Sequence, residues 1–99
     1  MKLSEAMLKG CEMVPRQIER AFMDGCEMRA PTGACAIGAA IVGRLGFPIS
    51  FEACLDEASL IQRELYIASG RDLYHRILAR NDSGESRESI AAWLAKMGL

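Results

Sequence analysis

Cys35 and His75 are the two residues whose chemistry together could support nucleophilic catalysis. Cys35 lies in the first turn of a predicted helix, where free backbone N–H groups and the helix dipole can lower the pKa of a thiol. His75 is the single histidine and is the natural base for such a thiol. The neighbours of Cys35 are Ala34, Ala36 and Ile37, however, and apolar surroundings raise the pKa of a thiol. We therefore predict no catalytic residue and expect that the protein is not an enzyme.

A small thiol-dependent or ligand-binding protein centred on Cys35 is the alternative function that the sequence leaves open. This alternative requires that polar side chains from distant parts of the chain meet Cys35 in one cleft. The residues of that candidate cleft are Thr32, Cys35, His75, Asn81 and Asp82.

The four cysteines, Cys11, Cys26, Cys35 and Cys54, are separated by 14, 8 and 18 residues. A zinc site usually contains closely spaced pairs such as Cys-x-x-Cys, because a short turn presents two thiolates to one ion. The observed spacing contains no such pair and predicts reduced, buried cysteines. Spacing alone leaves open whether any of the four binds a metal or is redox-active.

Two further segments lack the residue patterns of cofactor and metal sites. The glycine-rich stretch Gly33–Gly43 lacks the Lys-Ser/Thr ending of a P-loop and the Gly-x-Gly-x-x-Gly spacing of a dinucleotide site. A calcium loop with Gly84 at its sixth position would begin at Ala79 and end at Ile90, which carry no carboxylate. We therefore predict no cofactor and no metal.

The elements that must position these residues are predicted to be helices. Ser4, Ser50, Asp72 and Ser86 are typical of the residue that precedes a helix. Between Phe51 and Ala68, apolar residues recur three and four positions apart, which is typical of one face of a helix. The predicted helices cover residues 4–14, 16–23, 34–45, 51–68, 72–80 and 86–97.

The segment Ala34–Leu45 is apolar on nearly all sides, as expected for a helix that others surround. Its small residues recur at three- and four-residue spacing and would let neighbouring backbones approach closely; they are Ala36, Ala39, Ala40 and Gly43. We predict an all-α fold, a compact irregular bundle of five or six helices around this central Ala/Gly-rich helix. The bundle is expected to form a single helical domain over residues 1–99.

The overall composition is that of an ordinary globular protein, with 99 residues of which 51% are hydrophobic and 25% charged. Twelve basic against thirteen acidic residues leave a net charge of −1, which provides no general attraction for nucleic acid or an anionic membrane. The apolar segment Ala34–Gly43 has ten residues, whereas a membrane-spanning helix needs about 20. The first ten residues lack the apolar core of a signal peptide. We expect a cytoplasmic protein that binds neither membranes nor nucleic acid.

Several short motifs follow one another in a fixed order. Leu3-Ser4-Glu5-Ala6 and Pro15-Arg16-Gln17 come first, Cys35-Ala36-Ile37-Gly38-Ala39-Ala40 follows, and Asn81-Asp82, Ser86-Arg87-Glu88 and Ile90-Ala91-x-Trp93-Leu94 come last. In this order the chain resembles a group of small bacterial and phage-associated helical proteins with no established activity. The resemblance covers both ends and the middle but not residues 46–75. It implies a compact helical domain, with no catalytic or ligand-binding residues to carry over.

The expected function is that of a non-catalytic protein-interaction or regulatory module, whose partner is a protein or a second copy in a homodimer. Met7, Met13, Met23 and Met28 lie in the first third of the chain. Flexible thioether side chains suit adaptable partner surfaces as well as irregular cores. An exposed apolar surface near the N-terminus is therefore the predicted interaction site.

Overall fold

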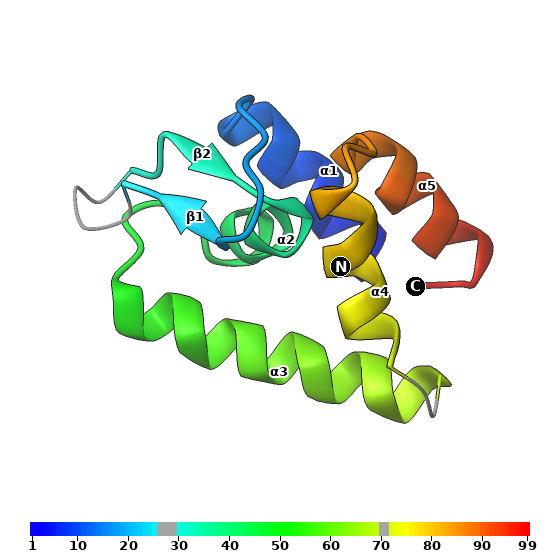
Figure 1. Cartoon of the computed structure of the whole chain (residues 1–99). Coiled ribbons are helices and arrows are strands. Elements are labelled where there is room, and N and C mark those ends of the chain that lie inside the picture. The colour runs from blue at the N-terminus through cyan, green and yellow to red at the C-terminus, as the bar shows by residue number, and fades with distance from the viewer. Residues whose placement is uncertain (26–29, 70–71) are drawn as a thin grey trace.

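The computed structural model describes residues 1–25, 30–69 and 72–99, and in these ranges the chain forms five helices and two short strands (Figure 1). In chain order they are α1 (Leu3–Met13), β1 (Met23–Asp24), β2 (Gly33–Ala34), α2 (Ala36–Leu45), α3 (Phe51–Ser69), α4 (Leu73–Asp82) and α5 (Arg87–Lys96). The radius of gyration is 12.0 Å, close to the value of about 13 Å expected for a compact chain of this length. The prediction of a compact, mostly helical protein is confirmed, whereas the two strands were not predicted.

Three of the four residues that were predicted to precede a helix do so in the structure. The hydroxyls of Ser50 and Ser86 accept hydrogen bonds from backbone N–H groups in the first turns of α3 and α5, at 3.0 and 3.1 Å. Asp72 precedes α4. The prediction for Ser4 is wrong, because α1 begins at Leu3. The N–H of Ser4 instead donates to the C=O of Leu99 at 3.1 Å, which joins the two ends of the described chain.

Residues 16–23 do not form the predicted helix. Their backbone groups pair with the strand that precedes α2: the N–H of Ala34 donates to Arg16 O at 3.0 Å, and the N–H of Ile18 donates to Ala34 O at 3.3 Å. Further along, β1 pairs antiparallel with β2, with Met23 opposite Ala34. The segment is extended because its hydrogen-bond partners lie at residues 33–35 and not one turn away, so the four-residue spacing of its apolar residues did not indicate a helix.

Helix α2 is the most deeply buried helix of the described chain, and every residue from Ala36 to Gly43 is fully or almost fully enclosed. It contacts α1, α3, α4 and α5. Where α1 crosses α2, a Cβ added to Gly43 would lie 1.8 Å from Ala6 O, and one added to Gly10 would lie 1.7 Å from Ala39 O. The close backbone approach that the small residues predict is confirmed at this crossing.

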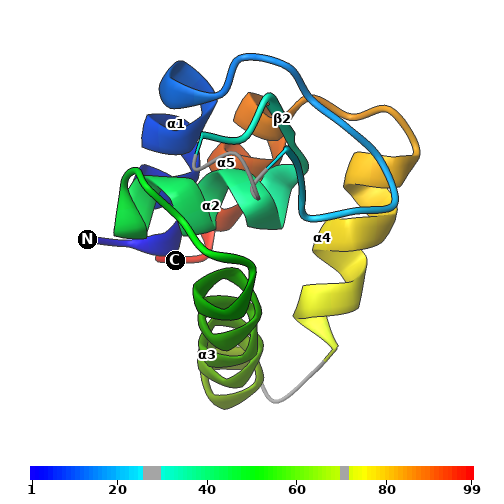
Figure 2. The same cartoon turned by 90° about the vertical axis from the view of Figure 1, so that its left-hand side faces the viewer.

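Helix α3 lies along one side of the molecule, next to α2 and α4 (Figures 1 and 2). Its buried side chains are Cys54, Ala58, Ile61 and Leu65, the middle of the predicted apolar stripe. Phe51 and Ala68, the ends of that stripe, are exposed. Within the described residues, no helix has both the length and the apolar character that crossing a membrane requires.

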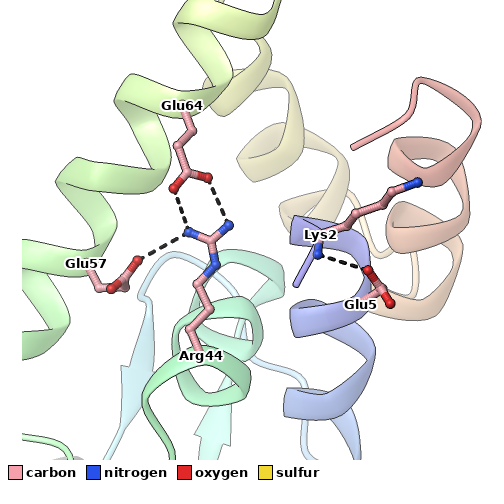
Figure 3. A network of polar contacts seen from close by, with 5 residues as sticks. All are labelled: Lys2, Glu5, Arg44, Glu57 and Glu64. Carbon is pink, nitrogen blue, oxygen red and sulfur yellow. Dashed lines mark hydrogen bonds and ion pairs between the residues drawn. The ribbon is translucent and has the colours of Figure 1, made fainter.

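Arg44, in the last turn of α2, fixes the position of α3 through charge (Figure 3). Its guanidinium donates to both carboxylate oxygens of Glu64, at 2.9 and 2.8 Å, and to Glu57 at 3.3 Å. These hydrogen bonds raise the pKa of Arg44 above its ordinary value. A bidentate contact of this kind restricts the orientation of both partners, so α3 is held in one position against α2.

Candidate functional site

Asn81, in the last turn of α4, is the centre of the most connected polar group in the described structure. Its side chain is completely buried. Its carbonyl oxygen accepts from the N–H of Ala36 at 3.0 Å and from Gln17 Nε2 at 2.9 Å. Its amide nitrogen donates to Ile18 O at 2.8 Å and to Asp82 Oδ1 at 3.3 Å. One side chain therefore joins α4, the start of α2 and the extended segment after α1.

Arg87 extends this polar group from the first turn of α5. It is 2% exposed, and its guanidinium donates to the carbonyl oxygens of Val14 and Pro15 at 2.7 Å and of Ala34 at 3.2 Å. Gln17 completes the connection, since its Oε1 accepts from the N–H of Arg87 at 3.2 Å. Within the described part of the chain, Arg87 Nε is the one buried side-chain nitrogen or oxygen without a partner.

Gln17 and Arg87 are the structural residues that sequence reasoning named only as parts of motifs. Both side chains bond mainly to backbone groups that lie up to 73 positions away in the chain. Residue spacing gives no signal for such contacts. The order of the Pro-x-Gln, Asn-Asp and Ser-Arg-Glu motifs was the available signal, and the structure brings these three motifs together.

Cys35 is the residue that precedes α2, and its thiol lies at the base of a pocket. Its Sγ accepts from the N–H of Gly38 at 3.4 Å, and the residue is 2% exposed. Burial raises the pKa of the thiol, and the nearby carboxylate of Asp82 raises it further, although backbone N–H groups at the start of the helix act in the opposite direction. The thiol is therefore protonated at neutral pH and is a poor nucleophile.

The pocket has a volume of about 330 Å³ and lies between the segment before β1, the start of α2 and one side of α4. Its lining residues are Arg20, Ala21, Phe22, Cys35, Leu78 and Asp82. Figure 2 shows the segment between α1 and β1 passing beside α4. The N–H of Arg20 donates to Asp82 Oδ1 at 3.0 Å, and this hydrogen bond joins the segment before β1 to the end of α4. Arg20, which has a positive φ of 63°, was not among the predicted site residues.

Of the predicted cleft, Cys35 and Asp82 line this pocket, and Asn81 lies behind it as a structural residue. Thr32 lies elsewhere: it is exposed at the start of β2, and its hydroxyl donates to Asp24 O at 3.3 Å. His75 is also separate, because it is exposed on α4, where it contacts the carboxylate of Asp72 and the ring of Tyr74. Cys35 and His75 therefore do not form the nucleophile and base of a catalytic pair.

Three of the four cysteines lie in the described residues, and all three, Cys11, Cys35 and Cys54, are buried. Burial raises the pKa of Cys11 as it does that of Cys35. Cys26 lies outside the described residues. A search of the residues that are described finds no cluster of three histidine, cysteine or acidic side chains able to hold a metal ion.

Exposed apolar side chains are concentrated on α3. Among the described residues, ten large hydrophobic side chains are exposed, and five of them belong to this helix: Phe51, Leu55, Leu60, Tyr66 and Ile67. The methionine-rich N-terminal third contributes less than predicted to the surface. Met7 is fully buried, and Met13 and Met23 are partly buried against the core. Met28 lies outside the described residues.

Comparison of the chain with protein-family models, with curated proteins and with solved structures gives no significant match. The resemblance drawn from the sequence motifs therefore stays a prediction.

Proposed function

We propose that the protein is a non-catalytic interaction module that forms a homodimer through the outer face of α3. The observation that carries this proposal is the concentration of five exposed large apolar side chains on one helix. A large exposed apolar patch on a globular protein is typical of an interaction site. Figure 2 views α3 along its axis and shows α2 and α4 on one side only, so the opposite side is free to receive a partner.

The order of residues along α3 favours a second copy of the same helix as the partner. Asp56 and Arg63 are seven residues apart and therefore project from nearly the same side of the helix. Both are exposed, and neither forms an ion pair or hydrogen bond with another described residue. They lie at almost equal distances from the middle of α3. In an antiparallel pair of these helices, Asp56 of each copy would lie opposite Arg63 of the other.

The apolar residues of α3 fit the same arrangement. Leu60 and Ile67 are seven residues apart and lie together beside the Asp56–Arg63 line, so both would border an antiparallel pair. Leu60 lies at the middle of the helix and would contact its own counterpart. Two-fold symmetric interfaces require such self-complementarity, in which residue i contacts residue j and j contacts i.

The remaining parts of the proposal follow from the same structure. We propose α2 as the central helix of an irregular bundle, supported by its burial and its contacts with all four other helices of the described chain. A cytoplasmic location is supported by Cys11 and Cys35, which are free thiols, since disulfides are uncommon in reducing compartments.

A charge-reversal series measured by sedimentation velocity tests the dimer. We expect the wild-type chain to associate reversibly, and we expect D56R or R63D to weaken association at least tenfold, because each places two pairs of like charges across the interface. The double variant D56R/R63D restores the opposite charges and should restore association. K9E, a charge reversal at an exposed residue of α1, is the matched control and should behave as wild type.

Two outcomes would overturn the proposal. One is a wild-type chain that stays monomeric at the highest accessible concentration. The other is a dimer whose affinity is the same in the wild type, the two single variants and the double variant, which would place the interface away from α3.

A further inference from the structure

The pocket above Cys35 is the feature of the molecule that the dimer does not use. Its volume of about 330 Å³ falls within the range of about 300–1,000 Å³ that small-molecule sites usually have. It lies between the segment before β1 and α4, whereas the proposed dimer surface lies on α3.

The inner part of the pocket is apolar. Phe22 and Leu78 are half-buried hydrophobic residues that pack against the core, and Ala21 lies beside them. Cys35 lies deepest, with its thiol already accepting a hydrogen bond from the N–H of Gly38. A protonated thiol in this position presents a small, polarisable and uncharged surface. The inner part therefore suits a short hydrocarbon group.

Two side chains of opposite charge, Arg20 and Asp82, line the same pocket. They are joined through the backbone, because the N–H of Arg20 donates to Asp82 Oδ1. Their charged groups do not form an ion pair with each other. Within the described residues, neither the guanidinium of Arg20 nor Oδ2 of Asp82 has a hydrogen-bond partner. The guanidinium of Arg20 and Oδ2 of Asp82 can therefore each form a hydrogen bond with a ligand.

The backbone around these residues is held in place before any ligand binds. Asn81 bonds to Ile18 O and to the N–H of Ala36, so it holds the segment before β1 against α2 and α4. Its amide also donates to Asp82 Oδ1, which orients that carboxylate. Because the backbone of the walls is already ordered, binding requires little loss of backbone conformational freedom in the protein.

We infer that this pocket binds a small zwitterion with an apolar side chain, of the chemical class of the aliphatic α-amino acids. The ligand's ammonium group would bind the carboxylate of Asp82, and its carboxylate would bind the guanidinium of Arg20. Its hydrocarbon side chain would lie against Phe22, Leu78 and Cys35. A ligand of single charge would be attracted by one of the two side chains and repelled by the other, whereas a zwitterion satisfies both.

Titration with L-leucine, followed by the chemical shifts of backbone amides, tests this inference. We expect saturable shifts at the pocket residues. We also expect at least tenfold weaker binding of 3-methylbutylamine and of 4-methylpentanoate, which each lack one of the two charges. D82N and R20Q should each weaken binding of L-leucine at least tenfold. R76Q, on an exposed part of α4, is the matched control and should bind as wild type.

The variants are first compared with the wild type by thermal unfolding, so that loss of binding is separated from loss of fold. Absence of a saturable response to L-leucine in the wild type would overturn the inference. Equal binding of L-leucine and its two singly charged analogues would also overturn it, as would wild-type binding by both D82N and R20Q. None of these outcomes bears on the α3 dimer, which the charge-reversal series tests separately.

Discussion

The side chain of Asn81 connects three parts of the fold, namely α4, the start of α2 and the extended segment after α1. A fully buried amide must satisfy its donors and its acceptor inside the protein, and Asn81 does so with groups from two other segments and from its neighbour Asp82. Arg87 acts in a similar way, since its buried guanidinium bonds to the backbone carbonyls of Val14, Pro15 and Ala34. These contacts replace the hydrogen bonds that residues 14–18 would have made in a helix.

Replacement of Asn81 by alanine should therefore destabilise the protein strongly. N81A leaves the N–H of Ala36 and the carbonyl of Ile18 without the partner they have now. An unsatisfied buried group costs about 1–3 kcal/mol, so we expect a loss of about 3 kcal/mol in the free energy of unfolding, measured by urea denaturation. S83A removes one exposed hydrogen bond, from Ser83 Oγ to Arg80 O, and should lower the free energy of unfolding by no more than about 1 kcal/mol. A loss below about 1 kcal/mol for N81A would contradict this role.

At the scale of elements, helix positions could be predicted well and the segment between α1 and β2 could not. Caps at Ser50 and Ser86 and the stripe Cys54–Leu65 are local signals, because a helix satisfies most of its backbone groups within four residues. Residues 16–23 depend on partners far along the chain, among them Asn81. The spacing of their apolar residues also fits a helix, and nothing in the neighbouring sequence indicates that these residues are extended.

The contact between α1 and α2 is the helix–helix contact most sensitive to the size of its residues. A Cβ at Gly43 would lie 1.8 Å from the backbone oxygen of Ala6, and a backbone atom cannot move aside as a flexible side chain does. The helices would have to separate along a contact that is otherwise tightly packed. We expect G43A to lower the free energy of unfolding by about 3 kcal/mol or more.

The control for G43A is G84A, because it also adds one methyl group to a glycine. Gly84 has a positive φ of 97°, but nothing lies within 4 Å of the added Cβ. Its cost should therefore be limited to the backbone conformation, about 1–2 kcal/mol. Unfolding of both variants in urea gives the comparison. A smaller loss for G43A than for G84A would mean that α1 and α2 can separate easily.

At the scale of the whole molecule, some residues of the candidate site could be predicted from the sequence and others could not, as was the case for the fold. The sequence identified Cys35, Asn81 and Asp82 as polar or reactive residues near turns, and the structure brings these three together. It does not bring Thr32 or His75 to them, because side-chain chemistry alone carries no information on which face of a helix or strand a residue occupies. Arg20 joins the pocket through the extended segment, so its position depends on the same distant contacts.

The stability of the whole molecule in alkali depends on buried groups that hold their protons more tightly when folded. Burial raises the pKa of Tyr74 to about 12, with smaller contributions from Cys35 and Cys54, whereas a tyrosine in an unfolded chain has a pKa of about 10. The folded state therefore binds more protons than the unfolded state between these values, and stability falls as the pH rises through this range. Below pH 10, Tyr74 contributes no pH dependence. The raised pKa values of the Cys11 and Cys35 thiols act in the same direction and start nearer pH 8.5.

Y74F should remove the part of this alkaline destabilisation that begins near pH 10 and leave the part from the thiols. The measurement is the urea midpoint between pH 7 and pH 11.5, at a protein concentration low enough to keep every chain monomeric. We expect the Y74F and wild-type curves to run parallel up to about pH 10 and the wild-type curve to fall more steeply above it. Y66F, which changes an exposed phenol on α3, should keep the wild-type slope. Parallel curves for Y74F and wild type up to pH 11.5 would show that the proton on Tyr74 is held no more tightly in the folded protein than in the unfolded chain.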